Sequence, residues 1–191
     1  MAGRIYYIPP AQTVVKIETP IRQWIVYKKN EMLIYNPDEN KAFRIIFEYP
    51  VSLPFFQAFI GVLKEDFGLS ELGYTLSKYE RRDASLISIW VPPKQAAPWL
   101  GDVTLEYRDN KLICVEFKDS KGKMASKSVY AKHVAFNSTY FPMEISTVYD
   151  SSPTATSEFI QLKNSRFNAP LPQDVANFQI PPNVVPREIR W

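Results

Sequence analysis

The chain has 191 residues, of which 46% are hydrophobic and 23% are charged, with a formal net charge of +3. This length suits one domain, and the small net charge argues against a nucleic-acid-binding protein, which usually carries a concentrated basic face. The 16 prolines and the 14% aromatic content favour short strands joined by turns over long helices. No stretch approaches the roughly 18 apolar residues of a membrane-spanning helix.

Segments rich in strand-forming residues follow one another through the first part of the chain. A polar turn at Lys28–Asn30 separates two of them and predicts a β-hairpin, and a second turn at Asn36–Asn40 precedes another strand. The expected strands are Gly3–Ile8, Val14–Glu18, Gln23–Tyr27, Glu31–Tyr35 and Ala42–Phe47.

One helix is predicted, at Leu53–Phe67. Ser52 can cap it, Pro54 suits its first turn and Gly68 can end it. Apolar residues spaced three and four apart form one stripe, which consists of Phe56, Phe59, Ile60, Leu63 and Phe67. Such a stripe fits a surface helix packed on a core or a lid over a ligand, and both alternatives remain open.

Alternation of apolar and polar residues is clearest in the second half of the chain. It surrounds the turn Asp109-Asn110 and is typical of a half-buried antiparallel hairpin. The apolar positions are Val103, Leu105, Tyr107, Ile113, Val115 and Phe117. Further strands are expected at Lys127–Phe136, around Met143–Tyr149 and at Glu158–Leu162, and mostly irregular structure from Asn164 onward. A meander of eight or more strands of this sort must curl or be covered.

Residues that carry chemistry are scarce. His133 is the single histidine and Cys114 the single cysteine. We expect His133 to be a satisfied strand residue, and Cys114 lies in mid-strand rather than at a helix N-terminus that would lower its pKa. Without a cysteine pair or a second histidine no metal site is expected, and no glycine-rich phosphate motif occurs. The sequence therefore predicts no catalytic residue and no cofactor.

Basic clusters lie beside predicted turns. They fit solvated turns that protect sheet edges, or a docking surface for an acidic partner or an anionic head group. The clusters are Lys28-Lys29, Arg81-Arg82 and the group Lys118, Lys121, Lys123 and Lys127.

Several short motifs resemble those of LolA-type outer-membrane lipoprotein carriers. The run Ile25–Pro37 is similar to the family's hairpin, in which the second strand ends in Tyr-x-Pro. Gly3–Pro10 resembles the family's strand ending in a proline turn, and Pro54-Phe55 falls where its mid-chain helix begins. Phe178–Pro182 resembles its C-terminal aromatic-x-x-Pro-Pro motif. In order and spacing, these motifs extend over most of the chain.

The resemblance implies an incomplete antiparallel barrel closed by helices, whose concave face holds acyl chains of a lipoprotein crossing the periplasm. The family's chain begins with a signal, a long helix and one more strand, so we expect an export signal upstream of Met1 in the gene. The carriers place an arginine before the proline of the first strand motif, where it helps to latch the lid. Pro9 stands there in this sequence, so the resemblance does not imply that latch.

We therefore expect a single domain over residues 1–191, a curved antiparallel sheet forming an incomplete barrel covered by the helix at Leu53–Phe67. The expected function is non-enzymatic carriage, in the periplasm, of a lipid or an acylated lipoprotein, with a membrane-bound donor or acceptor protein as a further partner. An acyl chain needs no polar chemistry to bind, because each buried methylene contributes ~0.8 kcal/mol. The candidate lining residues are Tyr7, Val15, Trp24, Val26, Leu33, Tyr35, Phe55, Phe59, Leu63, Leu105, Tyr107, Val115 and Phe117.

Two alternatives come from other functional classes. A protein-interaction or lipid-sensing adaptor on the same fold would have a tightly packed interior without ligand. An enzyme would use the hollow as an active site and would direct a cluster of titratable groups into it.

Overall fold

The computed structural model describes residues 1–9, 12–28, 30–47, 61–64, 66–136, 139–150 and 155–190. These residues are mainly β, with 13 strands in two sheets. The chain divides into two compact units, which we call the terminal unit (Met1–Ser52 with Asn168–Trp191) and the central unit (Leu53–Phe167). Within the described ranges, no helix is long and apolar enough to cross a membrane. Organisation as a single domain stays a prediction.

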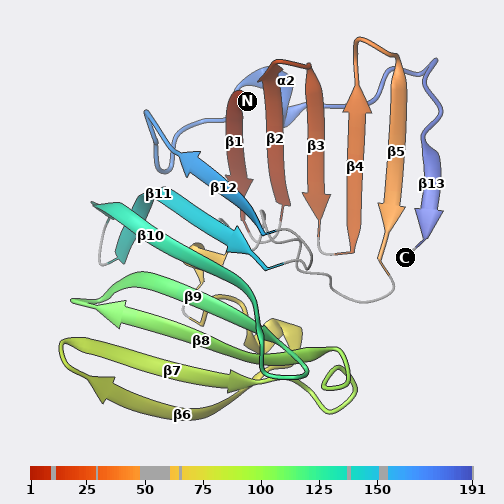
Figure 1. Ribbon diagram of the computed structural model, residues 1–191. Helices are drawn as coiled ribbons and strands as arrows, with labels where there is room; N and C mark the ends of the chain where they lie inside the picture. The colour runs from red at the N-terminus through yellow and green to blue at the C-terminus, as the bar shows by residue number, and fades with distance from the viewer. Residues whose placement is uncertain are drawn as a thin grey trace. The chain divides into compact units, whose positions relative to one another are not determined.

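The terminal unit contains a six-stranded sheet in the order β1-β2-β3-β4-β5-β13 (Figure 1). Neighbours among the first five strands are antiparallel, which confirms the predicted hairpins, whereas β13 runs parallel to β5. Its strands are β1 (Ala2–Ile8), β2 (Gln12–Thr19), β3 (Gln23–Lys28), β4 (Glu31–Asn36), β5 (Lys41–Ile46) and β13 (Arg187–Arg190).

One face of this terminal sheet is covered by residues 171–184, which we call the C-terminal segment. Val175, on the short helix α2 (Gln173–Ala176), packs with Val14 and Val26 of the sheet. Further along the segment, Val184 packs with Tyr35 and Ala42. The C-terminal segment was expected to be mostly irregular, and it supplies the apolar layer that this face of the sheet needs.

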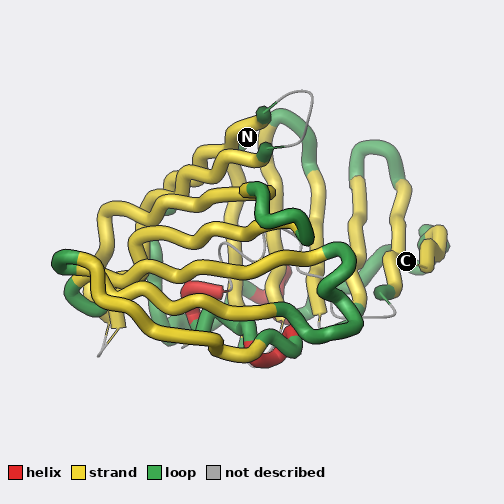
Figure 2. The backbone as a smooth tube through the Cα atoms, turned by 60° about the horizontal axis from the view of Figure 1, so that its bottom comes forward, coloured by secondary structure: helices red, strands yellow, loops and turns green. Residues whose placement is uncertain are grey.

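The central unit contains a seven-stranded antiparallel sheet in the order β12-β11-β10-β9-β8-β7-β6 (Figure 1). Strands dominate the backbone trace, and helical turns are short (Figure 2). Its strands are β6 (Thr75–Arg82), β7 (Ser85–Val91), β8 (Leu100–Arg108), β9 (Lys111–Asp119), β10 (Met124–Phe136), β11 (Thr139–Tyr149) and β12 (Thr156–Gln161).

The expectation of one continuous antiparallel sheet is wrong for the described residues. Hydrogen bonding divides their strands between two sheets, and one pairing, β5 with β13, is parallel. Each sheet ends in two edge strands, so neither closes on itself. The prediction of a mainly β fold without a closed barrel is confirmed.

The core of the central unit lies on one face of its sheet. The segment before β6, which contains η1 (Gly61–Leu63) and η2 (Ser70–Leu72), contributes Phe67, Leu69 and Tyr74 to this core. These side chains are almost fully buried, at 1%, 0% and 6% exposure. The sheet contributes Trp90, Val103, Leu105, Leu112, Val115, Tyr130 and Ile145.

A continuous α-helix as far as Phe67 is wrong where the structure describes the segment. Gly61–Leu63 is a 3₁₀ turn, and Phe67 has a φ of 60°, which an α-helix does not allow. In this conformation the Phe67 ring packs in the core. The ring also lies close to Gly61, because a Cβ added at that glycine would be 2.6 Å from it. The remainder of the predicted helix, Leu53–Ile60 and Glu65, lies outside the described residues.

Candidate functional site

A groove of about 430 Å³ opens on the core-bearing face of the central sheet. Strands β6, β7 and β8 build it, and the register places Ser88 opposite Leu105 and Leu86 opposite Tyr107. Paired residues of antiparallel strands share a face, so these side chains form adjacent rows. The groove is lined by Asp66, Tyr79, Leu86, Ser88, Trp90, Leu105, Tyr107 and Asn110.

The groove has a buried apolar floor and an exposed apolar rim. Leu105 and Trp90 are 1% and 8% exposed, whereas Leu86 and Tyr79 are 43% and 61% exposed. The indole Nε1 of Trp90 donates a hydrogen bond of 3.0 Å to Oγ of Ser88, so both polar groups of the floor have a partner. An apolar ligand can therefore bind this floor without leaving a buried polar group lacking a hydrogen-bond partner.

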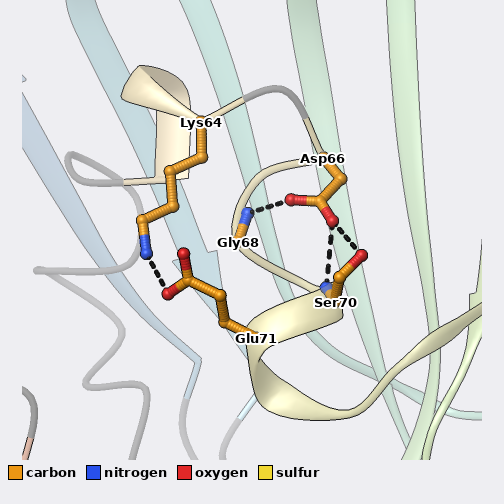
Figure 3. Close-up of polar contacts among 5 residues, drawn as sticks. All are labelled: Lys64, Asp66, Gly68, Ser70 and Glu71. Atoms are coloured by element: carbon orange, nitrogen blue, oxygen red, sulfur yellow. Dashed lines mark hydrogen bonds and ion pairs between the residues drawn. The ribbon is translucent and has the colours of Figure 1, made fainter.

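Asp66 is held in place by the turn that follows it (Figure 3). Its Oδ1 accepts a hydrogen bond from the Gly68 N–H at 2.9 Å, and its Oδ2 accepts from the Ser70 N–H at 3.1 Å and from the Ser70 hydroxyl. Burial acts to raise the pKa of Asp66, but these hydrogen bonds outweigh it and hold the pKa below its ordinary value. An ion pair between Lys64 and Glu71 also spans this loop (Figure 3).

Two titratable groups of the groove, Asp66 and Tyr107, are not tuned to neutral pH. Burial raises the pKa of Tyr107 to about 12, and the negative charge of Asp66 and the neighbouring Tyr79 contribute. A general acid or base works best with a pKa near the working pH. Asp66 and Tyr107 have pKa values shifted away from that range in opposite directions, so neither has the character of a proton-transfer residue.

Cys114 and His133 do not line the groove. Burial raises the pKa of the Cys114 thiol, which disfavours its reactive thiolate form. The Nε2 atom of His133 lies 2.8 Å from the carbonyl oxygen of Leu112, and since a carbonyl only accepts, Nε2–H is the donor. Among the residues that the structure describes, no group of three or more His, Cys, Asp or Glu side chains could hold a metal ion.

Comparison with solved structures finds similar folds, and three of them have the following similarity to this chain. A LolA superfamily protein from Nitrosomonas europaea has a TM-score of 0.56 and 14% identity, covering 86% of this chain and 78% of its own. A domain described as an outer membrane lipoprotein-sorting protein, from Vibrio parahaemolyticus, has a TM-score of 0.50 and 10% identity, covering 87% and 80%. A DUF1329 family protein from Desulfovibrio piger has a TM-score of 0.57 and 12% identity, covering 92% and 80%.

The chain has a LolA-like fold. The suspected resemblance to LolA-type proteins is thus confirmed at the level of the fold, which is what identities of 10% to 14% establish. No protein-family model matches the sequence. No curated protein matches it either.

On this LolA-like fold, four of the predicted lining residues share the core-bearing face of the central sheet. Leu105 and Tyr107 line the groove. Val115 is fully buried in the core beside them, and Phe117 packs against that core, with its ring centroid 6.3 Å from that of Phe67. The alternation read from the sequence thus placed these four residues together.

The predicted lining residues of the terminal unit divide between two faces of its sheet. The register places Trp24 opposite Tyr35 and Val26 opposite Leu33, and all four pack in clusters that include the C-terminal segment. Tyr7 and Val15 lie on the opposite face, because Tyr7 pairs with Thr13 and Val15 with Ile25. One surface of this sheet cannot present both sets.

The remaining predicted lining residues belong to the expected helix. Leu63 lies in η1 and is 38% exposed, while Phe55 and Phe59 lie outside the described residues. Contact of any of the 13 candidates with a ligand stays a prediction. Sequence reasoning missed Leu86, Ser88 and Trp90, although the run of strand-forming residues from Leu86 to Val91, before Pro92-Pro93, was a signal for a strand.

The terminal unit has a second groove of about 410 Å³, near Lys16, Arg22 and Trp24. Its cations already have partners. Nζ of Lys16 lies 2.7 Å from a carboxylate oxygen of Asp174 and 4.8 Å from the centroid of the Trp24 ring, and Arg22 pairs with Asp38. The groove of the central unit is therefore the better candidate.

Proposed function

We propose that this protein is a non-enzymatic carrier that binds a lipid, or the acyl chains of a lipoprotein, in the groove of the central unit. The supporting observation is the apolar floor of Trp90 and Leu105 in a groove that the exposed side chains of Leu86 and Tyr79 also line. At ~0.8 kcal/mol per buried methylene, a chain of several carbons gains enough free energy to bind there without a charged partner.

The proposed location is the periplasm, and the proposed further partner is a membrane-bound donor or acceptor protein. Support comes from the fold neighbours, one of which is described as an outer membrane lipoprotein-sorting protein. An open groove favours a carrier over an adaptor with a closed interior. The displaced pKa values of Asp66 and Tyr107 favour a carrier over an enzyme.

The test is a pair of charge substitutions on opposite faces of the same sheet. Leu86→Asp places a carboxylate at the groove, and Val129→Asp places one at a residue of similar exposure, 47% against 43%, away from the groove. We expect Leu86→Asp to weaken binding of a fluorescent fatty-acyl probe roughly tenfold or more, because burial of an unpaired charge is costly. Val129→Asp should bind the probe like the unmodified protein.

Mass spectrometry of the freshly purified protein under native conditions gives a second measurement. The proposal predicts bound lipid in the unmodified chain and in Val129→Asp, and its loss in Leu86→Asp. Equal probe affinities in the two variants, with both folded, would contradict binding in this groove.

A further inference from the structure

The connection from β7 to β8 carries an exposed aromatic side chain that the proposed carrier function does not use. Trp99 is 73% exposed, and its neighbour Leu100 is 45% exposed. Tryptophan is usually well buried in folded proteins, so a tryptophan held in water is unusual. It is also the residue best suited to a boundary between water and lipid, since its ring is apolar and its N–H is polar.

The backbone of this connection is an ordered turn. The N–H groups of Ala96 and Ala97 donate to the carbonyl oxygen of Pro93 at 2.9 and 3.0 Å, and those of Trp99 and Leu100 both donate to that of Ala96 at 2.9 Å. Three prolines, Pro92, Pro93 and Pro98, further restrict the chain. Trp99 is therefore presented by a prearranged backbone, which reduces the entropy lost when it binds a surface.

A lysine-bearing turn lies beside Trp99. Leu100 pairs with Asp119 in the ladder between β8 and β9, so the β7–β8 connection and the β9–β10 turn meet at one end of the central sheet (Figure 1). The turn carries Lys121 and Lys123 and follows Lys118, and the β7–β8 connection adds the exposed Lys94. These residues include most of one basic cluster noted in the sequence.

Asp119 and Asp150 at this end have partners, but only Asp150 is paired with a cation. Oδ1 of Asp119 accepts hydrogen bonds of 2.9 Å from the N–H groups of Lys121 and Lys123, and Nζ of Lys123 pairs with Asp150 at 3.0 Å. Within the described ranges, Lys94, Lys118 and Lys121 form no ion pair, and the carboxylate of Asp102 lies two residues after Leu100 on β8. Four lysines, Lys94, Lys118, Lys121 and Lys123, stand against three carboxylates, Asp102, Asp119 and Asp150, so this end of the sheet carries one net positive charge.

We propose that Trp99 and Leu100, with Lys94, Lys118 and Lys121, form a docking surface for an anionic lipid bilayer. The tryptophan and leucine insert at the level of the head groups, and the lysines contact lipid phosphates. Charge complementarity favours this partner. A stable protein interface needs about 800 Å² on each partner, whereas a projecting turn with one large side chain is suited to inserting between lipid head groups. This inference does not rest on the proposed groove.

Sedimentation with lipid vesicles tests the inference. We expect the protein to bind vesicles that contain phosphatidylglycerol, to bind pure phosphatidylcholine vesicles much more weakly, and to dissociate at high salt. Trp99→Ala should lower the vesicle partition coefficient roughly tenfold, by loss of interfacial burial. Lys118→Gln and Lys121→Gln should each lower it roughly fivefold. All three residues are at the surface, and circular dichroism checks that the variants fold.

Two matched controls separate this surface from general exposure and charge. Phe159 is 62% exposed elsewhere on the central sheet, and Arg81 is an exposed cation near the β6–β7 turn, at the other end of the strands. Phe159→Ala and Arg81→Gln should bind anionic vesicles like the unmodified protein.

Four outcomes would overturn the inference. The first is equal binding to neutral and anionic vesicles. The second is an equal loss of binding in Phe159→Ala and Trp99→Ala. The third is vesicle binding that is lost in Leu86→Asp but kept in Trp99→Ala, which would assign the binding to lipid uptake by the groove. Absence of vesicle binding, with Trp99-dependent capture of a protein, would likewise replace the bilayer with a protein partner.

Discussion

The ring of Phe178 stacks on that of Trp24, with centroids 4.5 Å apart and planes inclined by 16°. On this face of the terminal sheet, Lys16 also lies over the Trp24 ring and pairs with Asp174 of α2. The C-terminal segment thus contacts β2 and β3 through an aromatic stack and an ion pair. Trp24, predicted from the sequence to line a ligand site, packs against the protein's own chain.

We expect Phe178→Ala to lower the free energy of unfolding by about 2–4 kcal/mol, because it removes both buried area and the stacked pair. Urea unfolding followed by circular dichroism measures this loss. Phe159→Ala is the control, since Phe159 is 62% exposed and should change stability by about 0.5 kcal/mol or less. An equally mild effect of Phe178→Ala would show that the stack does not stabilise the terminal unit.

Phe67→Ala should lower the free energy of unfolding by about 3–5 kcal/mol, since Phe67 is 1% exposed and its loss leaves a cavity in the core. Phe59 belongs to the same apolar stripe but lies outside the described residues. For Phe59→Ala the prediction remains weaker binding of a fluorescent acyl probe with a modest change in the unfolding midpoint. Denaturant titrations and probe titrations of both variants check these expectations. A collapse in stability with unchanged probe affinity in Phe59→Ala would assign Phe59 to the core as well.

The carboxylate of Asp66 should stabilise the fold in a pH-dependent way. Its pKa is lowered in the folded state, so its contribution is fully present above the unfolded pKa of about 3.9 and is lost as pH falls through the folded pKa. Asp66→Asn should therefore cost roughly 1 kcal/mol at neutral pH. The difference from the unmodified protein should shrink below about pH 4. Unfolding free energies measured across this range test the sign, and a difference that grows on acidification would contradict it.

Cys114 should react slowly with a thiol reagent in the folded protein. Burial raises its pKa and so reduces the reactive thiolate. We expect the reaction with Ellman's reagent to accelerate roughly tenfold or more in urea, when the strand opens.

Cys114→Ala and His133→Ala should both leave acyl-probe binding nearly intact. Loss of function in either folded variant would reveal a role for that residue in the site.

Much of the strand pattern was predictable because it is local. The first five strands begin and end within two residues of their predicted bounds, since turns such as Asn36–Asn40 and alternating side chains mark them. Strand β6 was missed because seven of its eight residues are exposed, which leaves no alternation to detect. Strand β13 is short and polar, and it forms only because β5 offers a parallel neighbour.

The candidate site was predictable only in part, for a related reason. Leu105 and Tyr107 were found because a strand's periodicity assigns residues to a face. The same periodicity does not tell what covers that face, so Trp24 and Tyr35 looked equally suited to a ligand and to the C-terminal segment. Asp66 carried no sequence signal, because its position depends on the left-handed φ of the next residue, Phe67.

The parallel strand β13 has a consequence for biosynthesis. The terminal unit is assembled from Met1–Ser52 and Asn168–Trp191, which are separated by the whole central unit. A ribosome therefore releases five strands of the terminal sheet long before the segment that covers one face and completes one edge. Contacts between such distant segments form slowly, whereas the central unit is continuous in sequence and can fold first. Until residues 168–191 emerge, the apolar face around Val14 and Val26 lacks the segment that covers it, and that interval is when a chaperone would be needed.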